Sequence, residues 1–291
     1  MNRNPHIRVV HESPTTAQVD GDNGLGQVVM TMATEMAIAK ATVAGIAWVG
    51  TVHSNHAGAA GLYPLMAARK GLIAMYLAVA NANGMPPWGG TSRLLGTNPI
   101  SIAVPTAEGP PFLLDIATTA ASHGSIKVVA QAGEAMPVGW VIGDDGQPIT
   151  DPARAHEGSL VPIGGYKGSG LNIAIGLLAG VLNGAAFGSS VIDHRVDLVS
   201  PTNTGQSMMV MRTDLFMPAE QILASISAHL DELRHSGSAS GAPVRLPGDR
   251  ADEVERENTE LGVPIPAPLM TGLTALARRL AVDEPVRRLG D

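Results

Sequence analysis

Two short apolar segments with a third segment between them constrain the fold of this chain more than any other feature. Residues 46–52 and 72–80 are almost wholly apolar over lengths typical of buried strands. Residues 58–70 between them are expected to form a helix, and a longer helix is expected over residues 25–44, ending at Gly45. With 291 residues the chain can also bury a substantial core. We therefore expect an α/β protein of one or two closely packed domains.

Strands and helices continue to alternate along the rest of the chain, but at uneven spacing. Strands are expected over residues 99–105, 112–116 and 207–212, and helices over residues 117–133, 168–184, 218–234 and within 248–280. The regular strand–helix units of a doubly wound sheet are missing. So is its G-x-G-x-x-G turn, because the nearest match, from Gly24, has Val29 in place of the third glycine. A different type of α/β fold is therefore expected.

Charge and composition exclude several classes of function. The net charge of −7 gives no basic field for nucleic acid or anionic lipid, so we expect neither as a partner. The chain has no cysteine, which excludes disulfides, thiolate metal sites and cysteine nucleophiles. Its longest apolar run, residues 173–187, is too short and too rich in glycine to span a membrane. The residues after Met1 do not resemble an export signal, so a cytoplasmic protein is expected.

The segment from His53 to His56 is the first with groups that could carry chemistry. It follows a predicted strand and enters a predicted helix, whose first backbone N–H groups could hold a phosphate. Histidine suits proton transfer because its pKa lies near neutral pH. The alternative is that both histidines only cap the turn. Two histidines at this spacing also resemble half of a zinc site, but no third ligand lies nearby in the sequence, so we expect no bound metal.

Three further polar segments are candidates for binding. Arg93 and Thr97 lie in a glycine-rich loop, residues 81–98, that is longer than a simple connection requires. Lys167 lies among glycines before a predicted helix, where an anion could bind. Asp115 ends a predicted strand, where its carboxylate could accept a hydrogen bond from a ribose hydroxyl. The structural alternatives are a loop of tight turns, a solvated charge and a helix N-cap, respectively.

Taken together, these segments closely resemble the malate/L-lactate dehydrogenase family, which also contains sulfolactate, ureidoglycolate and diketogulonate dehydrogenases and piperideine-2-carboxylate reductases. The resemblance covers nearly the whole chain, and its specificity comes from the combination of motifs. The matching stretches are SNHAGAAG (54–61), PWGGTSRLLGTNPISIAVP (87–105), LDIATT (114–119), DGQPITDP (145–152) and GGYKGSGL (164–171).

The resemblance implies a fold, a cofactor and an assembly. The fold would be a non-Rossmann nicotinamide-binding α/β fold with a mixed, largely antiparallel sheet flanked by helices. The cofactor would be NAD or NADP, the substrate a small anionic molecule, and the active form a homodimer with shared active sites. Residues 1–52 are expected to be the remainder of an N-terminal or substrate domain, and residues 53–235 the nucleotide- and substrate-binding core. Residues 236–291 would form a C-terminal helical segment packing back on that core.

The family's site residues can be carried over onto matching positions of this chain. His56 and His123 are the catalytic candidates within this sequence, and Arg93 and Thr97 are the candidates for substrate binding. The expected cofactor contacts are His56, Ala57, Gly58, Ala59, Ala60, Asp115, Ile116, Ala117, His123, Gly124, Lys167, Gly168, Gly248 and Asp249.

Two departures from the family pattern bear on catalysis. Family members carry a further N-terminal stretch whose Ser-His-Gly motif supplies a catalytic histidine, with an arginine nearby, and this chain is expected to begin after it. The motif Ser122-His123-Gly124 is a different one. It lies where the malate branch has Arg-Gly-Lys and the imine-reducing branch has His-Gly-Asp, and Ser125 replaces both that lysine and that aspartate. The His-Gly pair favours the imine branch, and the missing aspartate argues against it.

Three functions therefore stay open from the sequence. The leading one is an NAD(P)-dependent oxidoreductase that interconverts a 2-oxo acid and a 2-hydroxy acid. The second is a cyclic-imine reductase acting on a piperideine- or pyrroline-2-carboxylate. The third is a truncated nucleotide-binding homologue with little or no catalysis.

Overall fold

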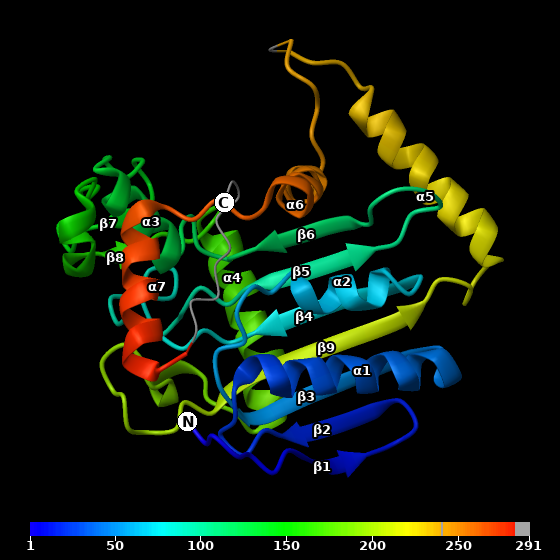
Figure 1. Cartoon of the computed structure of the whole chain (residues 1–291), viewed down its shortest axis with the longest axis horizontal. Coiled ribbons are helices and arrows are strands. Elements are labelled where there is room, and N and C mark those ends of the chain that lie inside the picture. The colour runs from blue at the N-terminus through cyan, green and yellow to red at the C-terminus, as the bar shows by residue number, and fades with distance from the viewer. Residues whose placement is uncertain (240, 283–291) are drawn as a thin grey trace. The chain divides into compact units, whose positions relative to one another are not determined.

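The computed structural model describes residues 1–239 and 241–282 of the chain (Figure 1). The chain divides into two compact units, one of residues 1–247 and the other beginning at Gly248. The second unit contains α6 (Asp249–Leu261) and α7 (Ala267–Leu280). None of the helices in the described residues is long and apolar enough to cross a membrane.

A seven-stranded sheet forms the centre of the first unit. In spatial order its strands are β1 (Arg8–Glu12), β2 (Thr16–Asp20), β3 (Ile46–Ser54), β9 (Thr204–Arg212), β4 (Leu72–Ala78), β5 (Ile100–Val104) and β6 (Phe112–Ile116). β2 and β3 run parallel, and the other neighbouring pairs run antiparallel. This arrangement confirms the mixed, largely antiparallel α/β fold expected from the sequence.

Helices cover both faces of the sheet. α1 (Gly26–Ala44) packs against β3 and β9, and α2 (Leu62–Ala68) packs against β4. Figure 1 shows both helices on one side of the sheet and α4 (Tyr166–Ile175) on the other. The two cores follow the alternation of side chains along a strand. In β4, Tyr76 faces the α1 and α2 core, whereas its neighbour Leu77 packs with Ile175 of α4.

A smaller lobe is built by the chain between β6 and α4. It contains α3 (His123–Ala132), β7 (Val141–Ile142), a 3-10 turn (Pro152–Glu157) and β8 (Ser159–Leu160). Its own apolar cluster includes Met85 and Leu95 from the loop after β4. The glycine-rich loop is therefore anchored to this lobe at both of these positions.

The structure corrects the expected bounds of three helices. The helix expected over residues 117–133 begins at His123, because Ser122 Oγ accepts the Ser125 N–H at 3.0 Å and caps it there. The helix expected from Gly58 begins at Leu62, since Gly58 has a φ of +78° that no helix contains. α4 is an α-helix up to Ile175 and then widens into a π-turn as far as Gly180. α5 (Ala219–Arg234) matches its expected bounds closely.

Candidate active site

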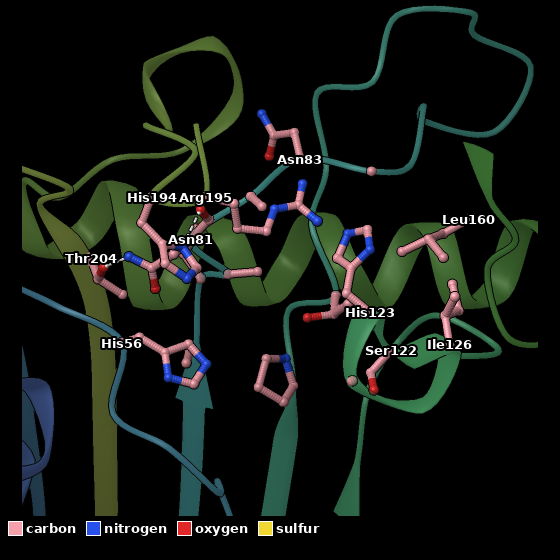
Figure 2. Close-up of a pocket in the computed structure, with 18 of the residues that line it drawn as sticks. His56, Asn81, Asn83, Ser122, His123, Ile126, Leu160, His194, Arg195 and Thr204 are labelled. Atoms are coloured by element: carbon pink, nitrogen blue, oxygen red, sulfur yellow. Dashed lines mark hydrogen bonds between the residues drawn. The ribbon is translucent and has the colours of Figure 1, made fainter. Parts of the chain in front are cut away.

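A pocket of about 990 Å³ opens where β3, β4 and β9 meet the smaller lobe (Figure 2). The ends of β3 and β4 and the start of β9 lie at one edge of the sheet because β9 runs antiparallel to both neighbours. The loop after β4, the first turn of α3, the 3-10 turn and the segment around His194 complete the lining. The volume is at the upper end of the range for small-molecule sites, about 300–1,000 Å³.

The charge of this pocket is opposite to that of the whole chain. The chain has a net charge of −7, yet no aspartate or glutamate occurs among the described residues that line the pocket. The basic lining residues are Arg93, Lys127, Arg195, His56, His123, His156 and His194. Positive groups around a concave surface raise the local concentration of anions. The pocket is therefore suited to an anionic ligand.

His56 is presented to the pocket by a tightly packed turn after β3. A Cβ atom on Gly26, the first residue of α1, would lie 2.2 Å from the backbone oxygen of Asn55 and 2.5 Å from that of His56. Gln206 of β9 donates from Nε2 to the same Asn55 oxygen at 2.8 Å. The absence of a side chain at residue 26 thus allows α1 to approach and fix the backbone that carries His56.

The His56 ring is held by its own turn and crowded by a second histidine. The backbone N–H of Gly58 donates to His56 Nδ1 at 3.1 Å. Burial, and to a lesser extent the neighbouring His194, lowers the pKa of His56 below its usual value. The centroids of the two rings are 6.0 Å apart, and their planes are tilted by 32°. His56 is therefore biased towards its neutral form.

His194 is held in the pocket by the backbone of Asn81. The Asn81 carbonyl accepts hydrogen bonds from His194 Nδ1 at 3.0 Å and from the His194 backbone N–H at 3.3 Å. Figure 2 shows His194 and His56 on the same side of the pocket. The sequence pattern does not indicate a role for His194, because its segment has no periodicity. The three consecutive titratable residues Asp193, His194 and Arg195 are the signal that could have drawn attention to it.

Asn81 also contributes an unsatisfied acceptor to the pocket. The residue is only 4% exposed, and its Nδ2 donates to Thr204 Oγ1. Its Oδ1 has no partner among the described residues. A buried amide oxygen without a hydrogen bond is unfavourable by about 1–3 kcal/mol. A ligand with an N–H or O–H donor, such as the carboxamide of nicotinamide, would relieve this.

His123 lies across the pocket from His56 and His194 (Figure 2). Its Nε2 is buried and lacks a partner among the described residues. Burial chiefly lowers the pKa of His123, the Arg195 guanidinium lowers it further, and Asp193 acts in the opposite direction. Arg195 itself pairs with Asp193 through Nε at 2.9 Å and through a terminal nitrogen at 2.6 Å. His123 is therefore also biased towards its neutral form.

Arg93 and Thr97 both line the pocket, as the substrate-binding prediction requires. Arg93 donates to Ser159 Oγ at 3.0 Å and to the backbone oxygens of His156 and Glu157 at 3.3 and 3.2 Å. Three of its five N–H groups are thus used to hold the smaller lobe, which leaves two for a ligand. The Thr97 carbonyl accepts from the backbone N–H and the hydroxyl of Thr118, both at 3.0 Å.

A buried amide network fixes the end of the loop that carries Thr97. Asn98 donates from Nδ2 to Asn172 Oδ1 at 2.8 Å, and Asn172 donates from its own Nδ2 to the Gly96 carbonyl at 2.8 Å. Both asparagine side chains are fully buried. α4 therefore positions this side of the pocket through side-chain hydrogen bonds.

The predicted cofactor contacts divide into three groups. His56, Ala57, Gly58, Ala60, His123 and Gly124 line the pocket, whereas Ala59, Asp115, Ile116, Ala117, Lys167 and Gly168 are not among its lining residues. Gly248 and Asp249 begin α6 in the second unit. No group of three or more His, Asp or Glu residues in the described residues is arranged to hold a metal ion. The roles assigned to all of these residues, inside and outside the pocket, stay predictions.

Comparison with known proteins identifies the relatives of this chain. It matches the family described as Malate/L-lactate dehydrogenase over residues 1–274. The malate dehydrogenase of Pyrococcus horikoshii is 35% identical over 295 residues, covering 97% of this chain and 80% of that protein. The L-sulfolactate dehydrogenase of Methanocaldococcus jannaschii is 37% identical over 259 residues, covering 89% and 73%. The ureidoglycolate dehydrogenase (NAD(+)) of Escherichia coli K12 is 34% identical over 266 residues, covering 91% and 75%.

The structural comparison agrees with the sequence matches. The solved malate dehydrogenase from P. horikoshii OT3 superposes with a TM-score of 0.87 at 31% identity, covering 97% of this chain and 79% of that chain. Fold and relatives together define an α/β oxidoreductase. The chain belongs to the malate/L-lactate dehydrogenase family.

Proposed function

We propose that this protein is an NAD(P)-dependent oxidoreductase that interconverts a small 2-oxo acid and its 2-hydroxy acid. The observation that carries the proposal is the pocket itself, which gathers histidine, arginine and lysine side chains and has no acidic lining residue in the described chain. A 2-oxo acid brings a carboxylate, and a dinucleotide brings a pyrophosphate. Both are anions that such a lining attracts.

The residues present are compatible with a nicotinamide cofactor. The pocket volume of about 990 Å³ provides space for a nicotinamide group beside a small acid. The unpartnered Asn81 Oδ1 offers an acceptor for a carboxamide N–H, and the backbone of Ala57 and Gly58 lies along the same wall. When bound, the cofactor donates hydride to the substrate or accepts hydride from it. NAD and NADP are both candidates, and the name of the E. coli relative includes NAD(+).

Carboxylate binding is assigned to the cationic side of the pocket. Arg195 carries a guanidinium, and its contacts with Asp193 leave further N–H groups for a ligand. Arg93 keeps two free N–H groups, and Thr97 lies on the same lining. Histidine supplies the proton chemistry, and His56, His123 and His194 all line the pocket. The names of the malate and sulfolactate dehydrogenase relatives support a small anionic hydroxy acid as the substrate.

The test is oxidation of NADH and NADPH by the 291-residue chain with pyruvate, oxaloacetate, sulfopyruvate and piperideine-2-carboxylate, followed at the absorbance of the reduced nicotinamide. We expect turnover with at least one of the three 2-oxo acids, at a kcat/KM well above that with the imine. Turnover restricted to the imine would support the cyclic-imine alternative. Binding of NADH in a fluorescence titration, without turnover of any of the four, would support the non-catalytic alternative. Either result would contradict the proposal.

A further inference from the structure

The two facing histidines are held in opposite tautomers. A backbone N–H can only donate, so the Gly58 contact makes His56 Nδ1 an acceptor and leaves the proton of the neutral ring on Nε2. A backbone carbonyl can only accept, so the Asn81 contact makes His194 Nδ1 a donor and leaves a lone pair on Nε2 of the neutral ring. Neither Nε2 has a hydrogen-bond partner among the described residues. One ring thus offers a donor to the pocket, and the other offers an acceptor.

The spacing of the rings leaves room for a ligand atom between them. The ring centroids are 6.0 Å apart, which is too far for the rings to hydrogen-bond each other directly, and both rings line the pocket. An oxygen atom of a ligand held beside both rings could reach an Nε2 of each at ordinary hydrogen-bond lengths. A hydroxyl group matches this arrangement, because its oxygen accepts one hydrogen bond and its hydrogen is donated in another.

We propose that His194 is a second catalytic residue, whose Nε2 exchanges the proton of the substrate's C2 hydroxyl while His56 donates a hydrogen bond from Nε2 to the same oxygen. The inference rests on the proposed function and assigns a separate role to each of the two histidines. In the direction of oxidation, the O–H bond breaks and its proton goes to His194 Nε2. The C2–H bond breaks and its hydride goes to the oxidised nicotinamide, and a C2=O bond forms. In the direction of reduction, protonated His194 returns the proton to the oxygen.

The surroundings of the two rings explain why the proton is assigned to His194. Adding a proton to His56 at Nδ1 would break its hydrogen bond with Gly58. Adding a proton to His194 at Nε2 keeps the bond from Nδ1 to the Asn81 carbonyl, which then stabilises the imidazolium. The lowered pKa of His56, caused first by burial and then by His194, acts in the same direction.

The charged and titratable neighbours of His194 come from the turn after β3 and from its own segment. His56 faces it from the turn after β3, and its own segment contributes Arg195 and Asp193, which are paired with each other. The neighbouring loop and β9 contribute the uncharged Asn81 and Thr204. Of these groups, His56 is the one whose ring lies against that of His194.

The first experiment compares His194→Gln with His56→Gln in the full chain, using the acid that the wild type turns over. We expect His194→Gln to lower kcat about 100- to 10,000-fold, as for loss of a general acid–base group, with little change in KM. It should also abolish the fall of the oxidation rate on the acid side of the profile. His56→Gln should lower kcat about 100- to 1,000-fold, as for loss of a hydrogen bond to the reacting oxygen, and should keep that fall. His229→Gln, an exposed histidine of α5 outside the pocket, is the matched control and should behave as wild type.

The outcomes separate this inference from the proposed function. If the wild type turns over a 2-oxo acid and His194→Gln keeps both its kcat and its pH profile, the inference is wrong and the proposed function stands. A wild type without turnover of any 2-oxo acid contradicts both.

A second experiment needs no turnover. Nitrogen-15 spectra of histidine-labelled wild type, assigned with the two variants, report the tautomer of each neutral ring. We expect the proton on Nε2 in His56 and on Nδ1 in His194. The same tautomer in both rings would overturn the inference.

Discussion

At the level of single residues, the pocket contains buried polar atoms that are held in place by the protein but have no hydrogen-bond partner. Asn81 holds Thr204 through its amide nitrogen and His194 through its carbonyl, while its Oδ1 has no partner. On the opposite side of the pocket, His123 Nε2 is also buried without a partner among the described residues. Folding alone does not favour such groups, because each loses its water without gaining a protein contact. Their presence in one pocket is best explained by a bound ligand.

Asn81→Asp tests this explanation with a nearly isosteric change. The new carboxylate would put a negative charge into a pocket that has no acidic lining residue in the described chain. Because the proposed cofactor and substrate are both anionic, we expect binding of NADH to weaken by at least about 10-fold. A fluorescence titration measures this, and unchanged affinity would argue against a ligand at this wall of the pocket.

The substitution Asp115→Asn replaces a carboxylate that does not line the pocket. Burial raises the pKa of Asp115, and the Gly61 N–H, which donates to Oδ2 at 2.8 Å, partly opposes this. A raised pKa in the folded state means that ionised Asp115 is less favourable in the folded than in the unfolded chain. Its contribution to stability is therefore greatest below the unfolded pKa, near 3.8, and falls as pH rises through the folded value.

The asparagine variant keeps an acceptor for Gly61 without the charge. We expect it to be more stable than wild type at pH 7, by less than about 1 kcal/mol because the carboxylate is partly exposed. The advantage should shrink towards pH 3. Denaturant unfolding at pH 7 and pH 3 checks this. A stability advantage of the variant that grows towards pH 3 would contradict a raised pKa for Asp115.

At the scale of elements, the site depends on how closely α1 approaches the turn after β3. Replacing Gly26 with alanine would place a Cβ 2.2 Å from the Asn55 oxygen, so either the helix or the turn must move. We expect Gly26→Ala to lower kcat at least about 10-fold, because displacement of a catalytic group by a fraction of an ångström is enough to disturb the reacting geometry.

Gly272→Ala is the matched control for that substitution. Gly272 lies in α7, has no heavy atom within 4 Å of a built Cβ, and should be neutral or slightly stabilised by alanine. Equal activity of the two variants would show that the approach of α1 does not position His56.

The sequence predicted where individual strands and helices lie better than it predicted which strands pair with one another. The strand at residues 112–116 and the helix ending at Arg234 follow directly from local pattern. The placement of β9 between β3 and β4 does not, because it depends on pairings between distant residues such as Val49 with Met208. The same limit applies to the site. His56 was found from its place at a strand end, whereas His194 reaches the pocket only through a backbone contact with Asn81, which leaves no periodic signal.

At the scale of the whole molecule, the homodimer implied by the family resemblance stays a prediction. Four leucine and valine side chains after α4 are 41–63% exposed and lie within one short stretch: Leu177, Leu178, Val181 and Leu182. Clusters of this kind on a surface often mark a subunit interface. We expect sedimentation equilibrium of the wild type to give twice the chain mass of 30.0 kDa. The substitution Leu182→Asp should shift the measured mass towards that of one chain. A monomeric wild type at micromolar concentration would contradict the prediction.

The proposed function requires hydride transfer between a nicotinamide and C2 of a small acid in this pocket. The most direct measurement uses NADH or NADPH with deuterium at both C4 positions of the nicotinamide, together with the 2-oxo acid that the chain turns over. Mass spectrometry of the product should show a 2-hydroxy acid with one deuterium bonded to C2. A product without deuterium at C2, or no 2-hydroxy acid at all, would contradict the claim.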